Sequence, residues 1–202
     1  MPATIAGIAV AVPADLTRRE DVACLVEAIR ERFGRLDVLV NNAGILGAHA
    51  PIAEYPEDAW DVVVAANLTA VFRLTKAALP LMPHGGSIIN VSSSVGRIGR
   101  AGWGAYSVSK FGVEGLSQVL ADELRERGIR VNTVNPGGTR TAMRAAAYPD
   151  EDSLTLPSPD DVTPIFVYLA SDESLDVTGR AFDARGWTPS SVAAAAARLT
   201  SS

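Results

Sequence analysis

The chain contains one cysteine and two histidines in 202 residues. A single cysteine, Cys24, excludes an internal disulfide and is typical of a reducing compartment such as the cytoplasm. Cys24 lies in an amphipathic helical pattern, which favours a core or half-buried position over a role as nucleophile. A His/Cys metal site needs several such ligands close together, so we expect no metal.

The sequence also lacks basic runs and long apolar stretches. Its net charge is −5, which argues against a nucleic-acid partner. Charged residues or asparagines interrupt the apolar stretches within about a dozen residues, fewer than the ~20 that a membrane-spanning helix needs. No signal peptide is evident. We therefore expect a cytoplasmic protein without a membrane segment, long enough for one domain with a sizeable core.

Short apolar runs alternate with amphipathic helical patterns along the chain. The runs predict strands at 5–12, 36–40, 87–91, 129–134 and 180–183. Helices are predicted at about 17–33, 56–81 (with a break near Asn67), 105–127 and 160–170. Thr17 is the expected N-cap of the first helix, with Glu20 as its capping-box partner.

This alternation predicts an α/β domain with a mostly parallel sheet over residues 1–187. A polar loop is predicted between Thr141 and the helix at 160–170, and a flexible or helical tail at 188–202. Polar turns follow three predicted strands, at 41–44, 92–94 and 136–141. Because ligands bind at the carboxyl ends of parallel strands, we expect these turns to form one site.

Tyr106 and Lys110 are four residues apart in the helix predicted at 105–127, and Ser93 precedes Tyr106 by thirteen residues. Residues at this spacing share a helix face, so the ammonium of Lys110 can lie beside the phenol of Tyr106. A nearby positive charge lowers a tyrosine pKa from ~10 and makes it a candidate general acid/base. An ordinary solvated pair is the alternative. Ser93 could hydrogen-bond the substrate oxygen.

These residues resemble the short-chain dehydrogenase/reductase family. The resemblance covers residues 5–186 and rests on pieces that occur in the family's order: Asp15, Asn41-Asn-Ala-Gly44, Asn67, Ser93, Tyr106 with Lys110, and Asn135-Pro-Gly137 leading to Thr141. It implies a three-layer Rossmann-like fold with a parallel sheet. It also implies an oxidoreductase that transfers hydride between NAD or NADP and a small carbonyl or alcohol substrate.

The resemblance assigns the catalytic roles. Tyr106 would be the acid/base, and Lys110 would lower its pKa and hold the nicotinamide ribose. Ser93 would bind the substrate oxygen, while Ser92 and Ser94 serve the backbone turn. Asn67 would interrupt its helix and hold a water that links Lys110 to bulk solvent, a place suited to the poor helix propensity of asparagine.

The resemblance also assigns the cofactor contacts. Asp15 would accept a hydrogen bond from the adenine amino group, although capping of the first helix is an equal alternative. The other contacts come from the two loops. They are Asn42, Ala43 and Gly44 on the adenosine-ribose side, and Pro136, Gly137 and Thr141 beside the nicotinamide amide and pyrophosphate.

The family also has a dimer interface, formed by the helices that match about 56–83 and 105–127. A homo-oligomer is therefore expected. The segment after Thr141 would cover the substrate, whose identity the sequence does not give.

The sequence departs from the family at its start. The family's Gly-rich turn, which puts a helix N-terminus against the pyrophosphate, has no match here. The run at 5–12 matches the third family strand, so we expect an N-terminally truncated domain without the first two βα units. The edge of the 36–40 strand should then be exposed and apolar. The choice between NAD and NADP is unreadable, and we expect dinucleotide to bind weakly or not at all.

Two alternatives come from other classes of protein. One is a catalytically impaired remnant that acts only as a binding or oligomerisation partner, and dinucleotide binding would distinguish it from an enzyme. The other is a serine hydrolase that uses Ser93. The hydrolase is disfavoured because the chain has no Gly-x-Ser-x-Gly elbow.

Overall fold

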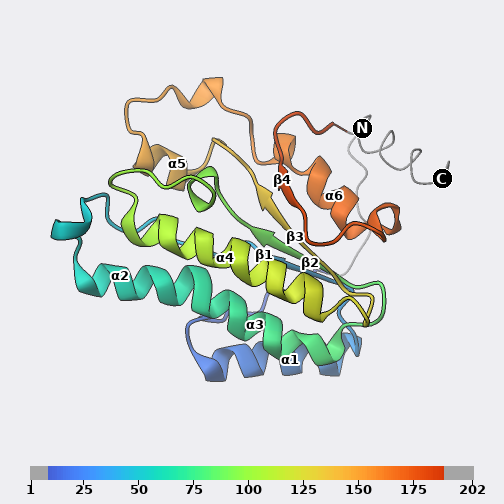
Figure 1. The fold of residues 1–202 in the computed structure, drawn as a ribbon. Helices are drawn as coiled ribbons and strands as arrows, with labels where there is room; N and C mark the ends of the chain where they lie inside the picture. The colour runs from blue at the N-terminus through green and yellow to red at the C-terminus, as the bar shows by residue number, and fades with distance from the viewer. Residues whose placement is uncertain (1–8, 189–202) are drawn as a thin grey trace.

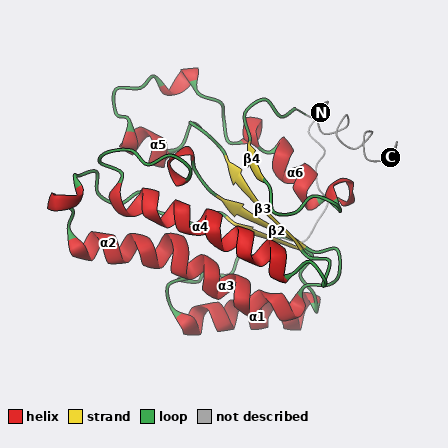
Figure 2. Ribbon diagram, viewed as in Figure 1, coloured by secondary structure: helices red, strands yellow, loops and turns green. Residues whose placement is uncertain are grey.

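A four-stranded parallel sheet forms the centre of the protein, whose computed structural model describes residues 9–188 (Figures 1 and 2). Its order is β1-β2-β3-β4, and the strands are β1 Val38–Asn41, β2 Ser87–Val91, β3 Arg130–Asn135 and β4 Ala181–Asp183. Each strand pairs in parallel with its neighbour. The strands predicted at 36–40, 87–91, 129–134 and 180–183 are therefore confirmed, with shifts of only a residue or two at their ends.

Helices cover both faces of the sheet. They are α1 Arg19–Phe33, α2 Glu57–Val64, α3 Ala70–Ala78, α4 Gly104–Glu123, α5 Ala142–Ala147 and α6 Pro164–Ala170. One buried cluster joins α1, α3 and α4 to the sheet, and a second joins α6 to its other face. The expected three-layer Rossmann-like arrangement is confirmed.

Neighbouring residues of β2 show how the sheet is held between these layers. Ile88 belongs to the cluster under α1, α3 and α4, whereas Ile89 belongs to the cluster under α6. All residues of β2 are buried, as expected for a central parallel strand. The adjacent isoleucines Ile88 and Ile89 therefore reflect burial on both faces.

A chain of buried amides ties the sheet to its helices. Asn41 donates to Oγ1 of Thr75 in α3 (3.1 Å) and to Oδ1 of Asn90 in β2 (2.8 Å). Asn90 in turn donates to Oγ of Ser117 in α4 (2.8 Å). Because these side chains are hydrogen-bonded to one another, their burial costs little. The same hydrogen bonds fix helices α3 and α4 against β1 and β2.

The predicted strand at 5–12 is wrong over its described part. Residues 9–12 form no strand, and residues 5–8 lie outside the described residues. A strand is stabilised by its ladder partners, and β1 is the last strand on that side of the described sheet. The expectation of an apolar β1 edge is confirmed, since Val40 is 44% exposed.

The start of α1 also differs from expectation. The N-cap is Arg18, and no side chain caps it, so the predicted capping box of Thr17 and Glu20 is wrong. Asp15 instead accepts from the backbone N–H (2.9 Å) and the hydroxyl (2.7 Å) of Thr17. The Asp15 N–H donates to the carboxylate of Asp21 (2.9 Å), so two aspartates organise this turn.

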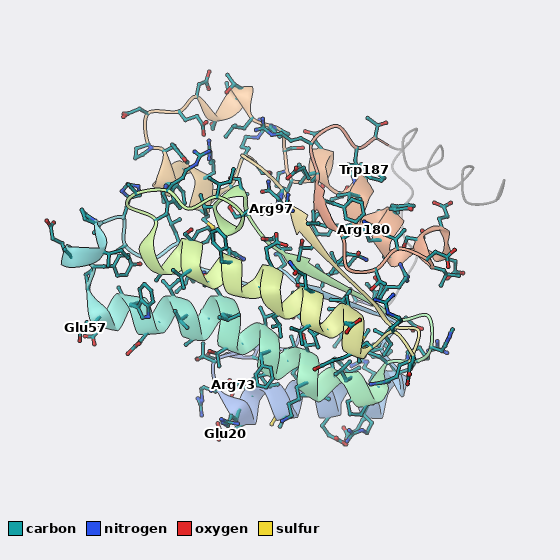
Figure 3. The ribbon with its side chains drawn as sticks, in the orientation of Figure 1. Glu20, Glu57, Arg73, Arg97, Arg180 and Trp187 are labelled. Atoms are coloured by element: carbon teal, nitrogen blue, oxygen red, sulfur yellow. The ribbon has the colours of Figure 1, made fainter. Side chains whose placement is uncertain are left out.

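Two further features of this layer concern single side chains. Cys24 is exposed, contrary to the core or half-buried position expected from its helix pattern. Arg73 of α3 reaches the carbonyl of Thr17 and so ties α3 to the segment that enters α1 (Figure 3).

The predicted break near Asn67 is confirmed as a π-helical turn, Ala65–Thr69, between α2 and α3. The stretch Glu57–Leu81 is also the one helix among the described residues that is long and apolar enough to cross a membrane. The expectation that no stretch is long and apolar enough to cross a membrane is therefore wrong. In the fold, α2 packs on α4 and α3 packs on α1.

The polar loop predicted after Thr141 contains a short helix, α5, which the sequence analysis did not predict. Thr141 is its N-cap and accepts from the backbone N–H of Arg144 (3.2 Å). The start of the predicted 160–170 helix is a separate 3₁₀ turn, Asp160–Val162, before α6. Of the predicted tail, residues 189–202 lie outside the described residues.

Candidate active site

The carboxyl ends of β1, β2 and β3 open onto a cavity of about 400 Å³. Nine of the predicted site residues line it: Asn42, Ala43, Gly44, Ser93, Tyr106, Lys110, Pro136, Gly137 and Thr141. The three polar turns and the first turns of α4 therefore come together as the strand order requires. Asp15 and Asn67 do not line the cavity.

Helix α4 carries Tyr106 and Lys110 on the same face. It begins at Gly104, directly after the Gly-rich loop, and its approach to the turn after β2 depends on Gly96. A Cβ on Gly96 would lie 2.8 Å from Cβ of Lys110, closer than real Cβ contacts permit. Gly96 thus lets the helix bring Lys110 against the end of β2.

Lys110 is a buried cation that pairs with no carboxylate among residues 9–188. Its side chain is 5% exposed, and its Nζ donates to the carbonyl of Val91 at the end of β2 (2.7 Å). Burial lowers its pKa from 10.5 to about 8, because an apolar environment disfavours the charged form. The ammonium is therefore poorly solvated and available to a polar ligand.

Tyr106 behaves differently from the sequence-based expectation. Burial raises the pKa of its phenol above 10.0, and a side-chain hydrogen bond with Ser93 only partly opposes that rise. Lys110 Nζ lies 5.7 Å from the centroid of the Tyr106 ring and is directed to Val91. The expectation that Lys110 lowers the pKa of Tyr106 is thus wrong for this arrangement, where desolvation dominates.

Both serines directly after β2 line the cavity, but they differ in their hydrogen bonds. Ser93 caps the 3₁₀ turn Ser94–Gly96 and accepts from the N–H of Val95 (3.4 Å). Ser92, expected to serve the turn, is 2% exposed and lines the cavity, and its Oγ has no hydrogen-bond partner within the described part of the chain. An unpaired buried hydroxyl facing a cavity is a ready contact for a polar ligand.

Asn67 lies behind the cavity wall and is fully buried. Its side-chain amide accepts from the N–H of Ile45 (2.8 Å), donates to the Ile45 carbonyl (2.8 Å), and donates to Oγ of Ser109 (3.2 Å). A Cβ on Gly44 would lie 3.2 Å from Oδ1 of Asn67. Asn67 therefore fixes the loop after β1 to the π turn, and its water-holding role stays a prediction.

Asp15 lies outside the cavity, in the turn before α1. Hydrogen bonds from Thr17 lower the pKa of its carboxyl. The capping alternative is wrong, because no side chain caps α1 and the Asp15 carboxylate accepts hydrogen bonds within the turn that precedes the helix. Its predicted contact with adenine stays a prediction.

Aromatic and apolar side chains also line the cavity. Trp103 packs on Tyr106 and on Tyr148, with ring centroids 5.8 and 5.9 Å apart. The wall also includes Leu46, Met143 and Ala147. The sequence analysis did not identify Trp103, although its position three residues before Tyr106 places it on the same face of the helix start.

Arg144 also lines the cavity, and an acidic partner holds its guanidinium. Glu151 accepts two hydrogen bonds from it, at 2.6 and 2.7 Å, and this pairing raises the pKa of Arg144 and lowers that of Glu151. The Arg144 guanidinium stacks on the Tyr148 ring at 3.7 Å. Among the described residues, no group of three or more His, Cys, Asp or Glu side chains could hold a metal.

The model of the short chain dehydrogenase family matches residues 2–152. The chain belongs to this family. Among its short chain dehydrogenase relatives is the uncharacterized oxidoreductase YciK of Escherichia coli, 49% identical over 163 residues that cover 80% of this chain and 64% of YciK. The chain thus spans about two thirds of the length of that relative. The 3-oxoacyl-[acyl-carrier-protein] reductase FabG of Thermotoga maritima is 40% identical over 82% of this chain and 71% of FabG.

Solved structures of short chain dehydrogenases agree with this fold. The E. coli YciK structure has 47% sequence identity and a TM-score of 0.81, and the match covers 85% of this chain and 71% of that one. A short chain dehydrogenase from Shigella flexneri 2a, complexed with NADP, has 47% identity and a TM-score of 0.80 over 85% of this chain and 73% of that chain. The relatives named here include oxidoreductases, and the Shigella flexneri protein was solved with NADP bound.

Proposed function

We propose that the chain is an NAD(P)-dependent oxidoreductase that interconverts a carbonyl and an alcohol, with Tyr106 as the acid/base. One observation carries the proposal: Ser93, Tyr106 and Lys110 face one cavity at the strand ends. Proton transfer and orientation are what such an arrangement can supply. The family and the nicotinamide complexes of its relatives supply the class of reaction.

The residues of the cavity fit the nicotinamide end of such a cofactor. Lys110 offers an ammonium that lacks an anionic partner, and Ser92 offers an unpaired buried hydroxyl. Gly44 and Gly137 expose backbone where a ligand can approach closely. Lys110 would hold a ribose hydroxyl, and the Pro136–Thr141 loop would border the amide.

The bound cofactor would supply or accept the hydride. During reduction, the Tyr106 phenol would donate its proton to the oxygen formed from the carbonyl, and Ser93 would hydrogen-bond the same oxygen. The raised pKa of Tyr106 keeps the phenol protonated at neutral pH, which is the form that reduction requires. In the reverse direction the phenolate would accept the alcohol proton.

The wall of the cavity favours a substrate with an apolar body. Trp103, Leu46 and Met143 would contact that body, while Arg144 is already paired with Glu151. Named relatives include a 3-oxoacyl reductase and a trans-4-hydroxycyclohexanecarboxylate dehydrogenase. Open-chain 3-oxo compounds and cyclic ketones or alcohols are therefore the first substrates to try.

We also propose that the protein forms a homo-oligomer through α2, α3 and α4. These helices present large apolar side chains to solvent, at 45–58% exposure: Val62, Phe72, Val108, Phe111 and Val119. Exposed apolar side chains gathered on neighbouring helices are typical of an interface. The exposed Cys24 suits a reducing, cytoplasmic setting.

Tyr106→Phe tests the acid/base assignment. We expect it to abolish turnover against the substrate panel at saturating cofactor, while NADPH binding measured by calorimetry changes little, because the phenol acts on the substrate oxygen. Tyr55→Phe is the matched control, since the Tyr55 hydroxyl is buried without a partner and lies outside the cavity lining. Full turnover by Tyr106→Phe would contradict the acid/base assignment, and no binding of either dinucleotide to the wild-type chain would favour the non-catalytic alternative.

A further inference from the structure

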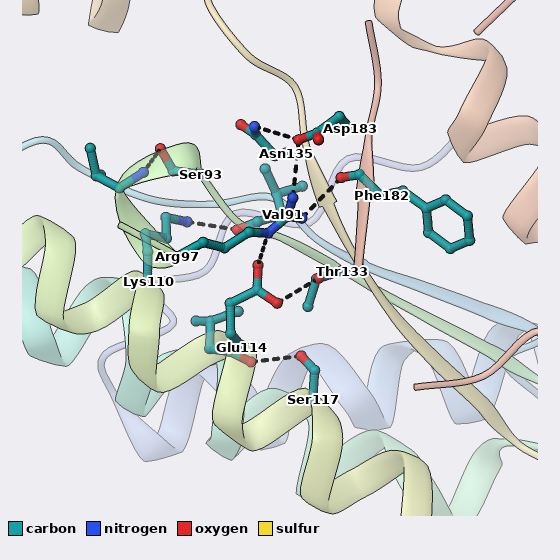
Figure 4. Close-up of polar contacts among 12 residues, drawn as sticks. Val91, Ser93, Arg97, Lys110, Glu114, Ser117, Thr133, Asn135, Phe182 and Asp183 are labelled. Atoms are coloured by element: carbon teal, nitrogen blue, oxygen red, sulfur yellow. Dashed lines mark hydrogen bonds and ion pairs between the residues drawn. The ribbon is translucent and has the colours of Figure 1, made fainter. Parts of the chain in front are cut away.

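Arg97 stands at the centre of a polar network that no part of the proposed chemistry uses (Figure 4). It follows the 3₁₀ turn after β2 and is only 28% exposed. Its guanidinium donates to Oε1 of Glu114 (3.0 Å), to Oδ1 of Asp183 (3.0 Å) and to the carbonyl of Phe182 (3.1 Å). One side chain thus joins helix α4 to the end of β4.

The α4 side of this network is rigid. Glu114 is 8% exposed, and its second carboxylate oxygen accepts from the hydroxyl of Thr133 in β3 (2.7 Å). Glu114 follows Lys110 by four residues, as Lys110 follows Tyr106, so all three share one face of the helix. A buried carboxylate with both oxygens paired holds its partners firmly, because leaving any of them unpaired is costly.

The other side of the network reaches the cavity. The Oδ1 atom of Asp183 also accepts from the side-chain amide of Asn135 (2.7 Å), at the end of β3. Asn135 then accepts, through its own Oδ1, from the N–H of Gly137 (3.0 Å). Gly137 lines the cavity and has a φ of 73°, a left-handed conformation that glycine adopts readily.

We propose that Arg97 is a positioning residue that holds the Asn135-Pro-Gly turn in register with the helix that carries Tyr106 and Lys110. Through Asp183 and Asn135 it orders the Gly137 turn, and through Glu114 it fixes that turn relative to α4. The distance between the two sides of the cavity is thereby fixed. One side is α4 with Tyr106 and Lys110, proposed for proton transfer, and the other is the turn at Gly137, proposed to border the cofactor amide. That consequence for catalysis rests on the proposed function, whereas the ordering of the turn does not.

The test is amide hydrogen exchange, followed by NMR on the full chain without cofactor. Arg97→Met keeps the aliphatic stem and removes the three donors. We expect the exchange of the Gly137 amide to accelerate about tenfold and its resonance to shift, because its acceptor loses the support of a charge-assisted hydrogen bond. Amides of Ile88 and Ile89 in β2 should exchange as in the wild type.

Asp183→Ala provides a second variant with a low risk of misfolding, because the Asp183 side chain is 64% exposed. It removes the link to Asn135 and leaves the Arg97–Glu114 pair intact, so it should reproduce the change at Gly137. Arg125→Met is the matched control for loss of one positive charge, since Arg125 is exposed and pairs only with Asp122 within its own helical turn.

Two results would overturn the proposal. One is a Gly137 exchange rate in both variants within about twofold of the wild-type rate, which would mean that the turn orders itself. The other is equal acceleration at Gly137 and throughout β2, which would give Arg97 a general role in stability. Because no cofactor or substrate is present, a failure of the proposed enzymatic activity would leave either outcome readable.

Discussion

At the scale of single residues, burial rather than charge pairing controls the candidate site. Lys110 is buried without an acidic partner, and Tyr106 is desolvated beside it. The Tyr-x-x-x-Lys spacing predicted that the two side chains would meet, and they do line one cavity. The spacing did not predict the pKa of either group, because desolvation depends on the helices and loops that exclude water.

The lowered pKa of Lys110 predicts how stability depends on pH. The folded protein binds fewer protons than the unfolded chain between about pH 8 and 10.5, so this residue makes stability rise with pH across that window. The cost of burying its charge is full below pH 8 and disappears above 10.5. Lys110→Met should therefore increase the free energy of unfolding at pH 7, by up to ~3 kcal/mol less the lost hydrogen bond to Val91.

Urea denaturation of both proteins at pH 7, 8.5 and 10 measures this effect, with the difference expected to shrink as pH rises. Lys76→Met is the control, because Lys76 is exposed and its loss should give a nearly constant difference. A difference for Lys110→Met that stays the same from pH 7 to 10 would show that the amine is not desolvated.

Removal of the Tyr55 hydroxyl gives a second stability prediction. Its buried hydroxyl has no hydrogen-bond partner, so removing it should stabilise the protein by about 1 kcal/mol. Tyr148→Phe is the matched comparison and should destabilise, because the Tyr148 hydroxyl hydrogen-bonds Arg144. Thermal unfolding of the two variants gives the answer. A lower midpoint for Tyr55→Phe than for the wild type would mean that this hydroxyl is satisfied in solution.

At the scale of elements, the π turn between α2 and α3 links the fold to the site. The extra residue in this turn directs Asn67 inward, where its side chain pairs with both backbone groups of Ile45. The loop after β1 is thereby held against Lys110. The close approach of Gly44 to the side chains of Asn67 and Lys110 indicates this. A regular helix through this segment would turn the amide away from the loop.

Asn67→Leu should destabilise the protein by about 3 kcal/mol, because the N–H and carbonyl of Ile45 would lose their buried partners. Asn42→Ala is the control, since Asn42 is exposed beside the same loop. Chemical denaturation with a common slope would measure both changes. Equal stability of Asn67→Leu and wild type would mean that the loop does not depend on this amide.

Elements were predictable where one local signal dominates. Strand β2 contains Ile88, Ile89 and Val91 and is buried throughout, and that strand was predicted with its observed bounds. The helix break at Asn67 followed from the poor helix propensity of asparagine. The short helix α5 was not predicted, since its six residues depend on the Thr141 cap and the Arg144–Glu151 pair rather than on an amphipathic pattern.

Other failures came from tertiary context. The run at 5–12 has strand propensity, yet its described part, 9–12, forms no strand, because propensity does not supply a ladder partner. Before α1, Asp21 accepts from the N–H of Asp15, and Asp15 accepts from the hydroxyl of Thr17. The Thr17 hydroxyl therefore does not cap the helix. Trp103 was missed because no polar chemistry marks an aromatic wall in a sequence.

At the scale of the whole molecule, the apolar face of α2, α3 and α4 predicts self-association. Phe111→Glu should convert an oligomer into a smaller species, because a charge would be buried in the interface. Light scattering coupled to size exclusion measures the mass of each species. Leu154→Glu is the control, since Leu154 is 77% exposed on a loop away from these helices. A wild-type chain that is already monomeric at high concentration would refute the proposed interface.

Helix α4 imposes a final constraint, because Tyr106, Lys110 and Glu114 follow one another at intervals of four residues. Inserting a single residue between Tyr106 and Lys110 would rotate the rest of the helix by about 100°. Lys110 would leave the cavity, Glu114 would leave Arg97, and the apolar face of the helix would swing with them. The number of residues between these three positions is therefore more constrained than the identity of the residues that separate them. A change of length within this segment should be far more damaging than substitution at its exposed positions.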